Sequence, residues 1–220
     1  MLRVCHIARE RTLVPWFFLL LLVLLPSCSS KDTNIRPTVQ IVSSSFEPVK
    51  PDAPYCRIDY NCPTSEIRSP RIYVFKSERR LLLVQDDTLV RDFRIGLGPH
   101  PSGDKFMRGD GRTPEGEFYV CVKNPDSKFY KSLGLSYPAP KHAEQAYLLG
   151  AISREEYFSI TDACRTRCIP PWNTVLGGAI FIHGGGAHED WTEGCVALSN
   201  SAMDELFEIV PVGAPVQILP

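Results

Sequence analysis

Residues 179–195 read AIFIHGGGAHEDWTEGC, and this stretch decides how the rest of the chain is interpreted. Its apolar start, residues 179–182, is typical of a short buried strand, which ends at His183. Three glycines follow, and glycine permits positive φ angles and a close approach of the backbone to a ligand. The loop is long enough to double back, so we expect Cys195 to face His183.

A cysteine that faces a histidine is the pattern of a thiol nucleophile with its base. A free thiol has a pKa of about 8.5, so a neighbouring imidazole must take its proton at neutral pH. Gly194 leaves room for a substrate and for a backbone N–H that stabilises an oxyanion, a donor that contributes about 2.7–4 kcal/mol at the transition state. Two alternatives stay open: a structural cysteine beside a satisfied histidine, and zinc bound by His183, His188 and Cys195.

The surrounding segments predict a mainly β fold with a helical insertion, residues 124–175, before the strand of His183. Residues 98–116 are rich in Gly, Pro and Asp, which indicates a long loop. Ser153 and Glu156 have the spacing of a capping box at a helix start. The expected strands are residues 71–75, 80–84, 90–96, 117–122, 179–182 and 215–219, and the expected helices are residues 141–150, 153–167 and 201–209, the last with Ser199 or Asn200 at its N-cap.

The N-terminus predicts export. Arg3, Arg9 and Arg11 precede the apolar run Trp16–Leu25, and small residues follow, so residues 1–27 have the layout of a signal peptide. The run has half of the about 20 residues that a membrane-spanning helix needs, although a short retained anchor is an alternative.

The segment Leu25-Pro26-Ser27-Cys28 resembles a bacterial lipobox, in which the cysteine carries lipid. The resemblance implies a lipid anchor at Cys28 and, because Ser29 is not an aspartate, retention at the outer membrane facing the periplasm. Residues 28–69 then predict a tether, whose last part, residues 55–69, is an ordered strap. The catalytic domain is expected at residues 70–220. A formal net charge of -1 gives no basic surface for nucleic acid.

The chain has eight cysteines, which is many for a reducing compartment. Five of them remain once Cys5 leaves with the signal peptide, Cys28 carries lipid and Cys195 acts as the nucleophile. The shortest loops pair Cys56 with Cys62 and Cys164 with Cys168, and Cys121 is then left over. Since five is odd, either one thiol stays reduced or this pairing is wrong.

Three ordered motifs carry a resemblance to a known family. They are Thr113-Pro114-Glu115-Gly116-Glu117-Phe118, then Ile182-His183-Gly184, then Thr192-x-Gly194-Cys195. On these motifs the chain resembles the L,D-transpeptidase catalytic domain family over residues 70–219. The resemblance implies a YkuD-like β-sandwich that acts on peptidoglycan stem peptides and needs no metal or other cofactor.

The resemblance also implies the roles of single residues. Cys195 would attack the carbonyl between the third and fourth stem residues, and His183 would act as base and acid. The N–H groups of Gly194 and Cys195 are the candidates for the oxyanion hole, Thr192 shapes the turn before the nucleophile, and Gly184 belongs to the same loop. The thioester would then be resolved by an amine or by water.

Other residues have weaker predicted roles. We expect Trp191 to be a packing residue that pins the loop, with contact to substrate as the alternative. Tyr137 in the insertion is expected to line the cleft, with packing as the alternative. Many relatives have a histidine where this chain has Glu193, which leaves the choice of acceptor open. Asp104, Lys105 and two nearby arginines are either solvated loop charges or contacts for charged stems. The rival functions are a hydrolase of the same fold, an L,D-carboxypeptidase or amidase, and a peptidoglycan-binding module without turnover.

Overall fold

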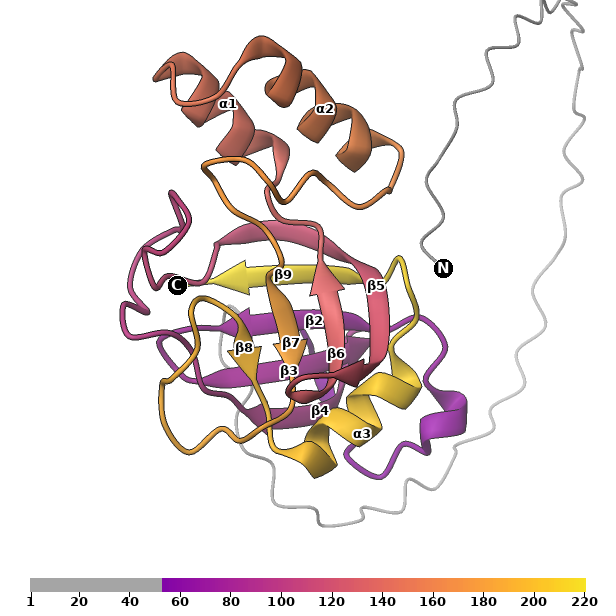
Figure 1. Cartoon of the computed structure of the whole chain (residues 1–220). Coiled ribbons are helices and arrows are strands. Elements are labelled where there is room, and N and C mark those ends of the chain that lie inside the picture. Colours follow the sequence, from indigo (N-terminus) through magenta and orange to yellow (C-terminus); the bar gives the residue numbers. More distant parts are fainter. Residues whose placement is uncertain (1–52) are drawn as a thin grey trace, which may run out of the picture. The chain divides into compact units, whose positions relative to one another are not determined.

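The computed structural model describes residues 53–220 (Figure 1). The strands are β1 (Arg57–Ile58), β2 (Arg71–Phe75), β3 (Arg80–Gln85), β4 (Thr88–Arg94), β5 (Gly116–Ser127), β6 (Tyr130–Leu135), β7 (Phe181–His183), β8 (Val196–Ala197) and β9 (Pro215–Leu219). The helices are the short 3-10 helix η1 (Thr64–Glu66) and α1 (Pro140–Leu148), α2 (Arg154–Arg165) and α3 (Asn200–Ile209). The predicted signal peptide and the predicted lipid site at Cys28 lie outside the described residues.

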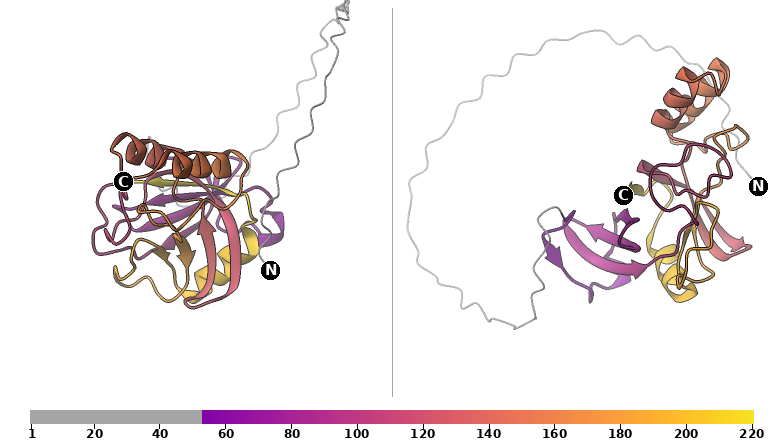
Figure 2. Two further views of the ribbon diagram at one scale, coloured as in Figure 1. Left: turned by 45° about the horizontal axis from the view of Figure 1, so that its top comes forward. Right: turned by 90° about the vertical axis from the view of Figure 1, so that its left-hand side faces the viewer.

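The strands form one mixed sheet in the order β1-β4-β3-β2-β9-β5-β6-β7-β8. Strand β5 pairs with β9 through its first residues and with β6 through its later ones, so it belongs to both halves of the sheet. Beyond β4, Gly96 forms a bridge to Ala197 of β8, which brings the two ends of the sheet together. Figure 2 shows the two halves facing each other, and the predicted mainly β sandwich is confirmed.

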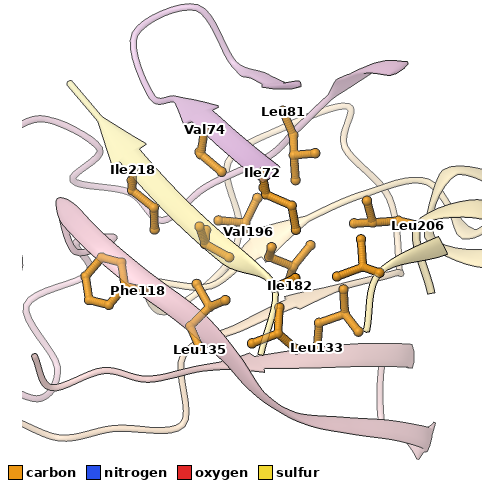
Figure 3. Close-up of a cluster of buried hydrophobic side chains, with 14 of the residues drawn as sticks. Ile72, Val74, Leu81, Phe118, Leu133, Leu135, Ile182, Val196, Leu206 and Ile218 are labelled. Atoms are coloured by element: carbon orange, nitrogen blue, oxygen red, sulfur yellow. The ribbon is translucent and has the colours of Figure 1, made fainter. Parts of the chain in front are cut away.

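The core fills the space between the two halves of the sheet. Figure 3 shows Ile72, Val74 and Leu81 from one half pointing toward Ile182 and Val196 from the other. Burying a side chain of this size stabilises the fold by about 1.5–3 kcal/mol. The core therefore fixes β7 and β8, the two strands that flank residues 183–195.

Helix α3 covers the end of this core with Met203, Leu206 and Ile209 and contacts β6. Its N-cap is Ser199, whose hydroxyl accepts a hydrogen bond from the N–H of Ala202. Of the two predicted N-cap residues, Ser199 and Asn200, the structure thus selects Ser199.

The helical insertion is confirmed as the hairpin of α1 and α2 (Figure 1). Its small apolar cluster includes Ala146, Ile160 and Leu176 and is separate from the main core. The capping box at the start of α2 is present, because Ser153 and Glu156 exchange side-chain hydrogen bonds with each other's backbone N–H groups.

None of the helices within residues 53–220 has the length and apolar character of a membrane-spanning segment.

Two predictions about the strands need correction. Strand β6 lies where only an insertion was expected, and strand β8 is so short that no periodicity could reveal it. Gly134 weakens the strand pattern of β6, but the structure needs it, because a Cβ there would lie 2.5 Å from Val122 and 2.9 Å from Phe181. The close approach of neighbouring side chains therefore explains why β6 contains Gly134, the residue that weakens its strand pattern.

The strap, residues 55–69, is ordered and contributes strand β1 to the sheet. Strand β1 runs parallel to β4, and Ile67 is buried in the main core. The predicted disulfides are wrong, since the six cysteines in the described part of the chain form no disulfide with one another. The thiols of Cys164 and Cys168 contact different backbone carbonyls, those of Pro138 and Thr166.

Candidate active site

His183 is the last residue of β7 and is held between two neighbouring strands. It pairs with Ser132 of β6 on one side and with Ala197 of β8 on the other. Its Nδ1 lies 2.6 Å from the carbonyl oxygen of Gly184, which can only accept, so Nδ1 carries the proton. The opposite nitrogen, Nε2, is therefore available to accept a proton, as a general base must be.

Burial tunes this imidazole. His183 is 3% exposed, and burial lowers its pKa below the ordinary 6.5, while the hydrogen bond to Gly184 opposes the shift. The ring of Phe129 stacks on the imidazole at 4.9 Å, and Trp191 meets it edge-on at 5.4 Å. The side chain is thus a neutral base in a fixed orientation at neutral pH.

Cys195 lies directly before β8, alongside the first residue of β7. Its Sγ accepts a hydrogen bond from the N–H of Phe181 at 3.4 Å and lies 3.7 Å from the carbonyl oxygen of Ala179. Burial raises the pKa of the thiol, whereas the Phe181 N–H and the charge of Lys105 lower it. The resting group is accordingly a neutral thiol, and a base is needed to ionise it.

The two predicted catalytic side chains come together in one pocket of about 600 Å³. Strands β7 and β8 are parallel neighbours, and His183 pairs with the residue two positions after Cys195. Side chains two positions apart on paired strands point to the same face. Among the hydrogen bonds of the described residues, none joins the thiol of Cys195 directly to the imidazole of His183.

Thr192 closes the turn before Cys195. Its hydroxyl donates to the carbonyl of Cys195 at 2.7 Å and accepts from the N–H of Gly194 at 3.2 Å. The predicted turn-forming position of Thr192 is therefore present. The prediction that the Gly194 N–H serves the oxyanion hole is wrong for this conformation, because that N–H is already bonded, and of the two candidates only the Cys195 N–H remains.

The glycine loop is also bonded internally. The N–H groups of Gly184 and Gly186 donate to the carbonyls of Lys131 and Leu198, and that of Gly185 donates to the side chain of Asn200. Gly184 itself leaves no room for a side chain, since a Cβ would lie 2.7 Å from Asn200 Oδ1. Gly184 is thus a packing requirement of the loop and offers no free oxyanion donor.

Asp190 ties the other side of this loop to the sheet. Its carboxylate accepts from the N–H of Leu97 at 2.8 Å and forms an ion pair of 2.6 Å with Arg79. Burial raises the pKa of Asp190, but these two partners outweigh it and hold the pKa below the ordinary value. The loop that carries Cys195 is therefore fixed at both ends.

Charged residues from three segments surround the pocket. Lys105 and Arg108 come from the loop before β5, Lys128 from the turn between β5 and β6, and Glu193 from the catalytic loop. Cations outnumber the acid, so the pocket suits a substrate with negative charges. Trp191 lines the same pocket and donates from its indole N–H to the carbonyl of Gly186, which pins the loop as expected.

The structure does not place every predicted residue at the site. Tyr137 has no exposed surface, lies in the main core and donates its hydroxyl proton to the carbonyl of Leu176. The predicted contact between Tyr137 and substrate is wrong, and packing is its role. Phe129, which the sequence did not single out, takes the place beside the base because the hairpin of β5 and β6 brings it there.

The zinc alternative does not fit the geometry. The side chain of His188 is 75% exposed and points to Glu189, 3.5 Å away. Within residues 53–220, histidine, cysteine, aspartate and glutamate side chains do not form a group of three that could hold a metal ion. In the described part of the chain, the pocket of His183 and Cys195 therefore lacks the third ligand that this alternative required.

Known proteins are similar to this chain in sequence and in fold. The Escherichia coli K12 protein "Putative L,D-transpeptidase YafK" is 27% identical over 151 residues, which are 63% of this chain and 46% of that protein, so the chain spans about half the length of this relative. Pgp2, a helical cell shape determining protein from Campylobacter jejuni, is 20% identical with a TM-score of 0.47, over 70% of this chain and 48% of that one. An L,D-transpeptidase structure from Xylanimonas cellulosilytica is 17% identical with a TM-score of 0.41, over 69% and 61% of the chains. Residues 69–218 match the L,D-transpeptidase catalytic domain, YkuD, and the chain belongs to this family.

Proposed function

We propose that this protein is a cysteine L,D-transpeptidase that transfers peptidoglycan stem peptides. The observation that carries the proposal is the common pocket of Cys195 and His183, with the imidazole at the end of β7 and the thiol directly before the parallel neighbour β8. The family to which the chain belongs supports the same assignment.

The reaction would begin with proton transfer from the Cys195 thiol to Nε2 of His183. The thiolate then attacks the carbonyl carbon between the third and fourth stem residues, and the carbonyl electrons move to the oxygen, where the Cys195 N–H is the candidate donor. Collapse of this intermediate breaks the amide C–N bond, and the departing amine takes the proton from the imidazolium. A thioester on Cys195 remains.

The second half-reaction would reverse the roles. An acceptor amine attacks the thioester carbonyl, His183 removes a proton from the amine, and the thiolate leaves and is reprotonated. The carboxylate of Glu193 borders the pocket, so it can attract the ammonium group of an acceptor before deprotonation. The charge of Glu193 therefore favours transfer of the acyl group to an amine. Transfer to water would instead make the protein a hydrolase.

The test is incubation of the full chain with purified disaccharide-tetrapeptide muropeptides, followed by chromatography and mass spectrometry. Cross-linked dimers would support transfer, whereas shortened monomers would assign hydrolysis in its place. Binding without any product would favour the peptidoglycan-binding module. The Cys195→Ala variant should lose product formation, and Cys164→Ala, which removes a thiol outside the pocket, should retain it.

We also propose that the chain is exported and held by lipid at Cys28, at the outer membrane and facing the periplasm. The support is the N-terminal sequence alone: a basic start, a ten-residue apolar run and a lipobox-like segment that Ser29 follows. Metabolic labelling with a radioactive fatty acid should label the wild-type chain and leave Cys28→Ala unlabelled. Labelling of both variants alike would contradict this anchor.

A further inference from the structure

Lys105 is a buried cation at the edge of the candidate active site. Its side chain is 3% exposed, yet it lines the same pocket as Cys195 and His183. Lysine is almost never buried to this extent unless its charge has a partner. The partner is Asp110, whose Oδ1 lies 2.6 Å from the Lys105 Nζ. Lys105 is thus not one of the solvated loop charges that its sequence context suggested.

The ion pair is built into the loop and does not depend on mobile side chains. The carboxylate of Asp110 also accepts hydrogen bonds from the backbone N–H groups of Phe106, Met107 and Arg112. These bonds fix Asp110 independently of the lysine. An ammonium group has three protons, and Asp110 takes one of them, so further protons can be directed into the pocket.

The loop is held to the sheet by a second buried lysine. The Nζ of Lys76 donates to the carbonyls of Gly103 and Thr113 and to the carboxylate of Glu115, at 2.6, 3.0 and 2.8 Å. Lys76 follows β2 directly and is only 1% exposed, so these bonds tie both sides of the loop to the end of β2. The position of the Lys105 ammonium is therefore set by the fold.

The charged and titratable residues that line the pocket together with the thiol come from four segments of the chain. They are Lys105 and Arg108 of the loop before β5, Lys128 of the turn between β5 and β6, His183 of β7 and Glu193 of the catalytic loop. Of these, Arg108, Lys128 and Glu193 are exposed, and His183 is a neutral base. An exposed charge is screened by water and salt, while a buried one is not. Lys105 is thus the one buried cation among the pocket residues of the described chain.

We infer that Lys105 is a positioning residue that stabilises the thiolate of Cys195 through the charge of its buried ammonium group. This inference rests on the proposed function, because it concerns the form of the nucleophile that this function requires. Burial works against the thiolate, and the Lys105 charge lowers the pKa of the thiol while Glu193 raises it. The lysine therefore offsets part of the cost of holding a negative charge in the pocket.

The test measures the pH profile of Cys195 alkylation by iodoacetamide, a neutral reagent that reacts with the thiolate. The full chain is purified in detergent, and alkylation is read by mass spectrometry on the peptide that contains Cys195. An opposite charge nearby lowers a pKa by about 1–3 units. Lys105→Met should therefore shift the profile upward by about one pH unit or more and slow alkylation at pH 7 about tenfold. Lys105→Arg should keep the wild-type profile.

Lys128→Met is the matched control, because it removes the same charge from an exposed position of the same pocket. Its profile should coincide with that of the wild type. If Lys105→Met fails to fold, Lys105→Gln provides a second neutral variant, whose side-chain amide can still donate a hydrogen bond to Asp110. A wild-type profile in either neutral variant would overturn the inference, as would an equal shift in Lys128→Met. Alkylation needs no peptidoglycan, so the effect of Lys105 can be measured whether or not the protein acts on muropeptides. A protein without muropeptide activity would contradict the proposed function, but it would not affect the alkylation result.

Discussion

The hydroxyl of Thr192 donates a hydrogen bond to the carbonyl of Cys195 at 2.7 Å and accepts one from the N–H of Gly194 at 3.2 Å. A single buried side chain thus bonds to two backbone groups of the turn that leads into Cys195, the Cys195 carbonyl and the Gly194 N–H. The same bonds remove the Gly194 N–H from the candidate oxyanion donors. The turn depends on the hydroxyl group, so a side chain of the same shape without a hydroxyl should destabilise it.

Replacement of Thr192 by valine tests this turn. Thr192→Val keeps the volume but leaves the Gly194 N–H without its acceptor, and an unsatisfied buried polar group costs about 1–3 kcal/mol. We expect the free energy of unfolding to fall by that amount in urea denaturation. Thr192→Ser keeps the hydroxyl and should stay near the wild type. Equal stability of the valine variant and the wild type would show that the turn does not depend on the hydroxyl.

The glycine before Cys195 is required by a contact as well as by its backbone angle. Gly194 has a φ of +124°, and a Cβ there would lie 2.5 Å from the carbonyl oxygen of Arg112. Gly150 has a φ of +68°, but a Cβ there would meet nothing within 4 Å. Gly150→Ala should therefore cost only the about 1–2 kcal/mol of left-handed backbone strain.

Gly194→Ala should cost clearly more than Gly150→Ala, because the clash with the Arg112 carbonyl adds to the strain. Thermal unfolding of the two variants side by side makes the comparison. If both alanine variants lost the same stability, the packing of the catalytic loop against Arg112 would be refuted.

The buried base predicts how stability depends on pH. Burial lowers the pKa of His183 in the folded chain below 6.5, so the unfolded chain binds this proton first as the pH falls. The contribution of neutral His183 is complete above pH 6.5 and is lost as the pH drops through the folded pKa. The slope for one such group reaches at most about 1.4 kcal/mol per pH unit.

Urea denaturation at pH 7.5 and pH 5 measures this loss. The wild type should lose more stability over this interval than His183→Gln, which has no proton to bind. His188→Gln is the control, because that imidazole is exposed, and it should follow the wild type. Asp104, Asp110 and Asp190 have pKa values lowered from 3.8, so their contributions are lost only below this interval. An identical pH dependence of wild type and His183→Gln would contradict the buried neutral base.

The sequence predicted the parts of the molecule that rest on local patterns. The alternation and apolar runs located most strands, and the spacing of Ser153 and Glu156 located the start of α2. The motif around residues 182–195 identified the two candidate catalytic residues, which the structure places in one pocket. Each of these signals comes from neighbours in the chain, and each was sufficient.

The parts that could not be predicted depend on contacts between distant segments. Gly134 hides β6 from any strand pattern, because the residue is chosen for its packing against Val122 and Phe181. Tyr137 was expected to line the cleft, but it is buried in the main core, where its hydroxyl donates to the carbonyl of Leu176 from a distant segment. The burial of Lys105 follows from its pairing with Asp110 within a loop whose fold local rules do not determine.

The most direct test of the central claim, that Cys195 is the nucleophile, is covalent trapping. The full chain is incubated with a carbapenem, a reagent expected to acylate a nucleophile of this kind, and the adduct is located by peptide mass spectrometry. We predict one adduct on the peptide that contains Cys195, its slower formation in His183→Gln, and its absence in Cys195→Ala. An adduct on another residue, or equal acylation of the Cys195→Ala variant, would contradict the assignment.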